Sequence, residues 1–218
     1  MKTGILLCGC GIGDGSAVEE VMLTYLALDK RQIEYTPLAI NESQHDVANH
    51  FAEKLTGEKR NILIESARIG RGIIADLGRF DNDQLDGLII PGGMGLFKNI
   101  STYMAEKDNF TVHPAVKKLI ENMYAQQKPI GGICASSLII AGSLSKSLHS
   151  NMKVCTFSDA YKEVLAGLKV KAINCPADGV IVDAENKIVT TPAFMASKNM
   201  HEIFFGIDKM VKTMVQLV

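Results

Sequence analysis

The 218-residue sequence lacks an excess of charge of either sign. It carries 23 basic and 24 acidic residues, so its formal net charge is −1. Recognition of nucleic acid or of an anionic membrane surface usually relies on a strongly basic field, so both classes of partner are disfavoured. No apolar run approaches the ~18 residues that a membrane-spanning helix requires. With 47% hydrophobic and 22% charged residues, the composition is that of a globular chain and excludes predominant disorder.

The chain also lacks the cysteine patterns of disulfide-rich and zinc proteins. Its five cysteines are an odd number, and its first residues are typical of a short strand ending in glycines, not of an export signal. A disulfide framework is therefore not expected, and we expect a cytoplasmic protein. Cys8 and Cys10 are too close in sequence for the usual zinc-ligand spacing, and no second pair completes a site, so no metal is expected.

Apolar runs alternate with helical patterns along almost the whole chain. Strands are predicted at residues 4–8, 33–40, 85–91, 129–133, 152–157 and 169–173, and helices at 16–30, 61–71, 114–127, 135–141, 161–165 and 194–218. Residues 41–60 and 94–112 are expected to be polar connections, and residues 180–191 a hairpin. The alternation predicts one α/β domain over residues 1–218, with a mainly parallel sheet covered on both faces and the antiparallel hairpin at its edge.

The glycine cluster after the first strand does not form a dinucleotide fingerprint. That fingerprint requires Gly-x-Gly-x-x-Gly, and counting from Gly9 or from Gly11 places Asp14 or Ser16 at the sixth position. The Asp14 carboxylate would also lie near a pyrophosphate. The cluster instead predicts a tight strand-to-helix turn whose backbone lines a pocket at the C-terminal edge of the sheet.

Cys134 differs from the other cysteines in its position. It follows the predicted strand 129–133 and precedes a helix of small residues, as a nucleophile held above a sheet by a sharp turn does. We expect unusual backbone angles there, and a thiol pKa lowered by the helix N-terminus. The N–H groups of Ala135 and of Gly93, after the neighbouring strand, are candidate donors to an oxyanion. An unreactive buried cysteine fits the same pattern.

A cysteine nucleophile needs a base, and no histidine neighbours Cys134 in the sequence. His45 and His50 share one polar segment and are candidates to line a cleft, although solvated histidines fit equally well. Glu19 and Glu20 lie at the start of the first predicted helix, where the helix dipole favours acids regardless of any catalytic role. The helical wheel does not decide which of the two points inward.

Several stretches, in order along nearly the whole chain, together resemble the ThiJ/PfpI superfamily, also described as class I glutamine-amidotransferase-like, and within it the ElbB-like branch. These matching stretches are CGxxDGS at 10–16, QHxVxNH at 44–50, RNxLxExARIxRG at 60–72, PGGxGxxKNxS at 91–101, the turn at Cys134, the segment 175–195 with NKIVTTPAxM, and GIDK at 206–209. The resemblance implies a flavodoxin-like three-layer sandwich, a reactive cysteine at Cys134 and a protonated glutamate at Glu20 that hydrogen-bonds the sulfur. It also implies a homodimer, and the apolar helix 16–30 fits either an interface or a core.

Ala135 stands where protease-like members have a histidine, so peptidase or glutaminase chemistry is not expected. A thiolate and one carboxyl are sufficient to convert a small dicarbonyl such as methylglyoxal into a 2-hydroxy acid through a hemithioacetal, with no metal or organic cofactor. We therefore expect a glyoxalase-type lyase (a hydro-lyase). A redox-sensing protein with an oxidisable Cys134, or a non-catalytic binding module of a branch named for isoprenoid biosynthesis, fits the same cysteine. Further pocket residues are expected among Gly11, Asp14, His45, His50, Gly92, Lys98 and Asn99.

Overall fold

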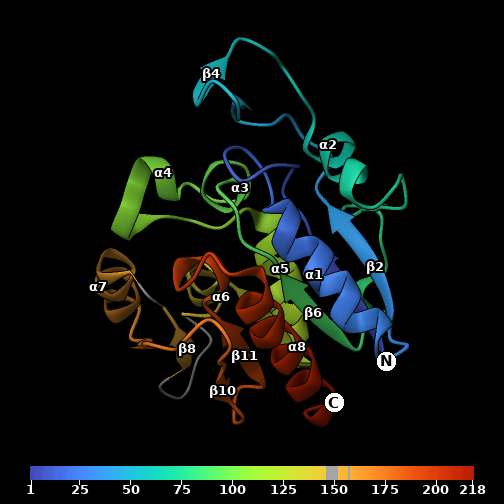
Figure 1. Ribbon diagram of the computed structural model, residues 1–218, viewed down its shortest axis with the longest axis vertical. Coiled ribbons are helices and arrows are strands. Elements are labelled where there is room, and N and C mark those ends of the chain that lie inside the picture. Colours follow the sequence, from blue (N-terminus) through green and yellow to red (C-terminus); the bar gives the residue numbers. More distant parts are fainter. Residues whose placement is uncertain (146–151, 157) are drawn as a thin grey trace.

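The computed structural model describes residues 1–145, 152–156 and 158–218 (Figure 1). Its central seven-stranded sheet is parallel except for the antiparallel pair at one edge. In spatial order the strands are β10 (Ile181–Asp183), β11 (Ile188–Thr191), β7 (Ile130–Ile133), β6 (Gly87–Ile90), β1 (Lys2–Leu6), β2 (Glu34–Ala39) and β5 (Ala75–Asp76). The predicted α/β class and the edge hairpin are confirmed.

Helices cover both faces of this sheet and make it the middle of three layers (Figure 1). The helices on one face are α1 (Val18–Asp29) and α8 (Met200–Gln216), and those on the other are α5 (Pro114–Ala125) and α6 (Ser136–Leu144). The packing of strand β6 on both faces explains why its sequence is apolar throughout. Leu88 and Ile90 pack in the core with α5 and α6, whereas Ile89 packs in the core with α1 and α8.

Two predicted strands do not join the central sheet. β8 (Lys153–Cys155) and β9 (Lys171–Ile173) form a separate parallel pair, connected by α7 (Asp159–Gly167). Residue 157, the last of the predicted strand 152–157, lies outside the described residues. Both strands are therefore confirmed, but a short apolar run predicts a strand without its partner.

The segment 94–112 is not the polar connection that was expected. It contains α3 (Gly95–Lys98), α4 (Tyr103–Glu106) and the 3-10 turn η2 (Lys107–Asn109), and it buries Phe97, Tyr103 and Phe110. The ring centroids of Phe97 and Tyr103 lie 4.6 Å apart and those of Tyr103 and Phe110 5.4 Å apart. Aromatic packing therefore organises a segment whose apolar residues follow no regular period.

Other connections carry short elements. The polar segment 41–60 forms a hairpin, β3 (Val47–Asn49) and β4 (Lys54–Thr56), which projects from the sheet at the top of Figure 1 and precedes α2 (Ile62–Ile69). The other 3-10 turns are η1 (Asn82–Gln84) and η3 (Ala193–Met195). The last helix begins at Met200, later than expected, because the Asn199 side chain caps it by accepting from the His201 and Glu202 N–H groups.

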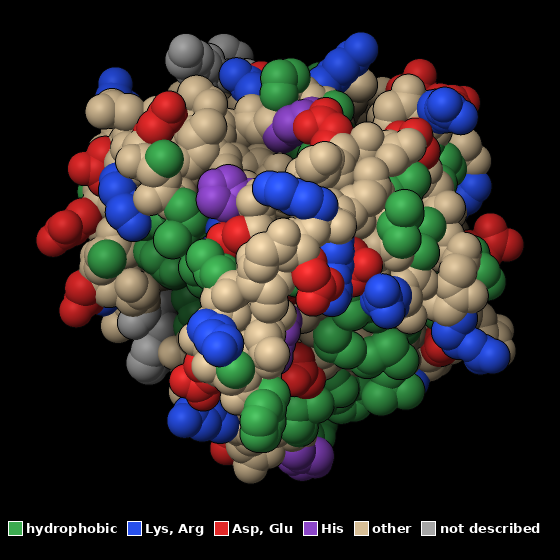
Figure 2. Space-filling view, turned by 90° about the horizontal axis from the view of Figure 1, so that it is seen from above, with side chains coloured by type: hydrophobic (Ala, Val, Ile, Leu, Met, Phe, Trp, Pro, Cys, Tyr) green, Lys and Arg blue, Asp and Glu red, His purple; other side chains and the backbone are tan. Residues whose placement is uncertain are grey.

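The surface seen from above the hairpin carries acidic and basic side chains interspersed, with no large patch of one sign (Figure 2). Within the described ranges, no helix combines the length and the apolar character needed to cross a bilayer. Because β1, β6, β7 and β11 are mutually parallel, the loops that follow them meet at one edge of the sheet. Cys134 lies at that edge.

Candidate active site

Cys134 occupies the junction between β7 and α6 with left-handed backbone geometry, at a φ of 59°. The predicted departure from the usual backbone wells is confirmed. A residue held in such a region costs about 1–3 kcal/mol and persists only where its surroundings impose it. One such restraint is the Cys134 N–H, which donates to the Thr191 carbonyl at 2.9 Å and ties the turn to β11.

Glu20 reaches the cysteine from the first turn of α1. Its side chain is fully buried, whereas Glu19 is exposed. The Glu20 carboxyl lies beside the Cys134 side chain, where burial and then the charge of this carboxyl raise the pKa of the thiol. Its Oε2 also accepts from the Gly92 N–H at 2.7 Å. The structure thus brings Glu20 to the sulfur and leaves Glu19 in solvent, a choice that the helical wheel could not make.

Gly92, in the loop that follows β6, allows the Glu20 carboxyl and the Cys134 side chain to approach each other closely. A Cβ placed on Gly92 would lie 2.6 Å from Glu20 Oε2, 2.6 Å from Cys134 Cβ and 3.1 Å from Cys134 Sγ. Any side chain there would therefore push the acid and the thiol apart. Of the expected pocket residues, Gly92 is the one that contacts both.

The electrostatics of the pair are dominated by burial. Burial raises the pKa of Glu20 from its usual 4.5 to about 7, although the hydrogen bonds from Gly92 and Cys134 oppose the rise. Burial, followed by the charge of Glu20, also raises the pKa of the Cys134 thiol well above its usual 9.0, and the Ala135 N–H opposes this. The expected lowering of the Cys134 pKa is therefore wrong, because desolvation of the sulfur outweighs the helix N-terminus.

The two expected oxyanion donors lie in different settings. The Ala135 N–H lies near the Cys134 sulfur and opposes the rise that burial causes in the pKa of its thiol. Gly93 has a φ of 119°, and a Cβ there would overlap the Gly15 carbonyl oxygen. In the described part of the chain no group accepts from the Gly93 N–H. The described residues therefore leave this N–H available to a ligand.

The other expected pocket residues gather in a second group, around the loop 9–16. Lys98 Nζ donates to the Gly13 carbonyl and pairs with Asp46 at 3.0 Å. His50 Nε2 accepts from the Gly13 N–H at 3.1 Å, over Gly11. The remaining members of this group are Asp14, His45 and Asn99. Ile12, Gly13, His50 and Lys98 line a cavity of about 440 Å³ with residues of the β3–β4 hairpin.

Sequence reasoning missed two residues next to the pair. Burial, with smaller contributions from Cys134 and Tyr103, raises the pKa of Tyr161 to about 12, which places this residue of α7 in the electrostatic surroundings of the thiol. The Phe194 N–H, in η3, lies near the Glu20 carboxyl and opposes the rise that burial causes in its pKa. No motif pointed to either residue, because each reaches the site through the fold of a distant segment.

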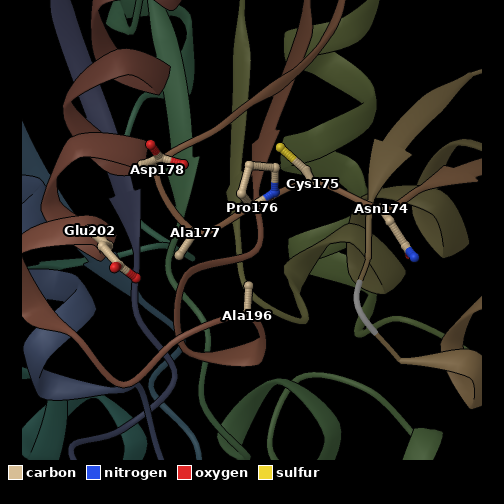
Figure 3. Close-up of a pocket in the computed structure, with 7 residues that line it drawn as sticks. All are labelled: Asn174, Cys175, Pro176, Ala177, Asp178, Ala196 and Glu202. Carbon is tan, nitrogen blue, oxygen red and sulfur yellow. The ribbon is translucent and has the colours of Figure 1, made fainter.

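A separate cavity of about 430 Å³ adjoins the η3 segment (Figure 3). The carboxylates of Asp178 and Glu202 lie on one side of the view and the Asn174 amide on the other. Cys134 and Glu20 are not among the residues that line it. Ala196, which lines this cavity, follows Phe194 of the Glu20 surroundings by two residues. The full lining is Asn174, Cys175, Pro176, Ala177, Asp178, Ala196 and Glu202.

No family model matches the chain. Two curated relatives span almost all of it. The ES1 protein homolog, mitochondrial, of Rattus norvegicus is 31% identical over 227 residues, 99% of this chain and 84% of that protein. The glutamine amidotransferase-like class 1 domain-containing protein 3, mitochondrial, of Homo sapiens is 32% identical over 224 residues, 99% of this chain and 83% of that protein.

Solved structures agree with this similarity. An isoprenoid biosynthesis protein with amidotransferase-like domain from Ehrlichia chaffeensis matches with a TM-score of 0.91 and 31% identity, over 100% of both chains. A DJ-1 superfamily protein from Salmonella typhimurium matches with a TM-score of 0.58 and 18% identity, over 99% of this chain and 89% of that one. At that lower identity the second match shows the fold alone.

The expectation of a cytoplasmic protein is contradicted by these relatives. The curated proteins from rat, human and Danio rerio are all named as mitochondrial. The expectation rested on an odd cysteine count and an unremarkable first strand. Neither feature identifies the compartment that holds the protein.

Proposed function

Because the chain belongs to the class 1 glutamine amidotransferase-like proteins of the ThiJ/PfpI superfamily, we propose that it is a glyoxalase-type enzyme that converts a small dicarbonyl such as methylglyoxal into a 2-hydroxy acid. The contact between the Cys134 side chain and the buried Glu20 carboxyl carries this proposal. A thiol and one proton acceptor in contact are the minimum that the reaction needs.

The first step is addition of the Cys134 sulfur to the aldehyde carbon. Glu20 accepts the thiol proton as the carbon–sulfur bond forms, and passes it to the new alkoxide to give a hemithioacetal. A pKa of about 7 suits a group that must both accept and return a proton near neutral pH. The developing oxyanion is stabilised by the Gly93 N–H, which has no acceptor in the described part of the protein.

In the second step Glu20 moves a proton between neighbouring carbons of the bound substrate. It removes the proton from the carbon that carries sulfur and returns it to the adjacent carbonyl carbon through an enediol, which leaves a thioester. Water then cleaves the thioester to give the 2-hydroxy acid and the free thiol. The net reaction adds one water to the dicarbonyl, and no electrons leave the substrate.

The histidines support a mechanism without an imidazole. His45, His50 and His113 bond Asp46, Gly13 and Glu42 respectively, and His201 packs on Phe205. His149 lies outside the described residues. With Ala135 after the nucleophile, this arrangement favours the two-residue chemistry over an amidase triad.

A redox-sensing role is the alternative that the same geometry favours. The Ala135 N–H and a protonated Glu20 would both donate to the oxygens of an oxidised Cys134. Oxidation would then be stoichiometric and would be prevented by substituting Cys134. A non-catalytic binding module would show neither turnover nor selective oxidation.

Steady-state lactate formation from methylglyoxal tests the proposal, with Cys134→Ser and Glu20→Gln as variants and Cys175→Ser as the matched control. We expect turnover in the wild-type protein and in Cys175→Ser, and none above background in Cys134→Ser. Wild-type protein that is inert toward dicarbonyls but consumes one equivalent of peroxide at Cys134 would favour the redox role and end the glyoxalase proposal.

A further inference from the structure

The loop 9–16, between β1 and α1, is contacted by side chains and backbone from several of the matching stretches. The Gly9 N–H donates to Ser66 Oγ of α2 at 2.9 Å. The Ala48 N–H donates to Asp14 Oδ2 at 2.7 Å, and Lys98 Nζ donates to the Gly13 carbonyl at 2.9 Å. None of these contacts involves Cys134 or Glu20.

The same loop is also hydrogen-bonded to the turn that contains Gly92 and Gly93. The Met94 N–H donates to the Ile12 carbonyl at 2.9 Å, and the Gly95 N–H donates to the Gly15 carbonyl at 3.0 Å. In return the Ala17 N–H donates to the Gly92 carbonyl at 2.9 Å. The position of Gly92 and Gly93 is therefore set by the position of loop 9–16.

Asn99 connects the residue before this loop, Cys8, to Asp14 within it. Its Nδ2 donates to the Cys8 carbonyl and to the Asp14 carbonyl, at 2.8 Å in each case. Its Oδ1 accepts from the His45 N–H at 2.9 Å. Because Asn99 follows α3 directly, it also belongs to the segment that begins with the Gly92–Gly95 turn. The Asn99 amide thus connects the turn, the loop and the segment that leads into the β3–β4 hairpin.

We propose that Asn99 is a positioning residue for the Cys134–Glu20 pair, and not a pocket residue. By bonding the Cys8 and Asp14 carbonyls together, Asn99 fixes loop 9–16 and with it the Gly92–Gly95 turn. That turn directs the Gly92 N–H onto Glu20 and leaves the Gly93 N–H free for the substrate oxygen. The effect on the substrate rests on the proposed function, whereas the effect on the acid and the thiol does not.

A displaced turn has a specific electrostatic consequence. The Gly92 hydrogen bond lowers the pKa of Glu20, so weakening it allows burial to raise that pKa further. Glu20 would then ionise at a higher pH. Because the ionised Glu20 takes up the thiol proton, the midpoint of the pH profile for Cys134 alkylation would rise with the pKa of Glu20. A residue that merely stabilised the fold would lower the melting temperature and leave this pH profile unchanged.

The test is the rate of Cys134 alkylation by iodoacetamide between pH 5 and 9, measured by mass spectrometry on the peptide that carries Cys134. Asn99→Asp keeps the acceptor for His45 and the shape of the side chain, but removes both donors. Asn122→Asp, on α5, makes the same chemical change on a helix that contacts β6, β7 and α6. We expect the alkylation midpoint to rise by about 0.5–1 pH unit in Asn99→Asp and to stay unchanged in Asn122→Asp.

Should Asn99→Asp fail to fold, Asn99→Ser decides the question, because it introduces no charge and leaves space for water to bridge the two carbonyls. A smaller shift in the same direction is expected there. Folded Asn99 variants with the wild-type alkylation profile would overturn the inference. Because alkylation needs no dicarbonyl, a shifted profile in a protein that does not turn over methylglyoxal would reject the proposed function alone.

Discussion

Replacing Glu20 by glutamine is expected to stabilise the protein while removing its chemistry. The substitution keeps the shape of the side chain, an acceptor for the Gly92 N–H and a donor to the Cys134 sulfur, but it removes the ionisable proton. Because a fully buried carboxylate is costly, the wild-type protein is destabilised whenever Glu20 is charged.

The size of this effect follows from the two pKa values of Glu20. Burial raises the folded-state pKa to about 7, against a usual value of 4.5 for an exposed glutamate. Below pH 4.5 the group is protonated in both states and contributes no difference. Between pH 4.5 and 7 the unfolded chain ionises first, so stability is lost as the pH rises, to a total of about 3 kcal/mol above pH 7.

Urea unfolding of both proteins at pH 4.5, 6, 7 and 8 measures this quantity. The stability advantage of Glu20→Gln over wild type should grow from pH 4.5 to 7 and then level off. Lactate formation from methylglyoxal by the same variant should fall by about 10²- to 10⁴-fold, since the proton acceptor is gone. A stability difference that does not change with pH would refute the reasoning from burial, whatever the activity shows.

Three further substitutions are expected to have separable effects. Cys134→Ser should abolish lactate formation and leave the circular dichroism spectrum unchanged; residual turnover would remove the cysteine from the mechanism. Gly92→Ala should destabilise the fold by about 1–3 kcal/mol by overpacking, and reduce turnover, because its Cβ would lie 2.6 Å from both Glu20 Oε2 and Cys134 Cβ; a fully active Gly92→Ala protein would contradict the close contact. On α1, Val18, Met22 and Leu26 are 36%, 48% and 48% exposed and lie four residues apart. We propose that they line the homodimer interface and that the Met22→Glu protein is a monomer, as measured by light scattering. A monomeric wild-type protein would reject this proposal.

The alternation of apolar runs and helical patterns was sufficient to predict the layered α/β fold, because a strand buried on both faces must be apolar at every position. The turn at Cys134 was also predictable. A strand that passes directly into a helix of small residues forces its junction residue out of the regular wells, and Cys134 is that residue. These features are local, so the order of residues along the chain determines them.

The partners of each segment depended on contacts between distant residues. Strands β8 and β9 pair with each other, and segment 94–112 folds around its aromatic rings, for reasons that no local period expresses. The choice between Glu19 and Glu20 required the packing of α1 on the sheet. The direction of the Cys134 pKa required its burial, since a helix N-terminus is visible in a sequence and desolvation is not. The sequence by itself thus determined the layers and the turn at Cys134. The tertiary structure decided which acid meets the thiol and in which direction its pKa moves, because burial and contact arise only when distant segments pack.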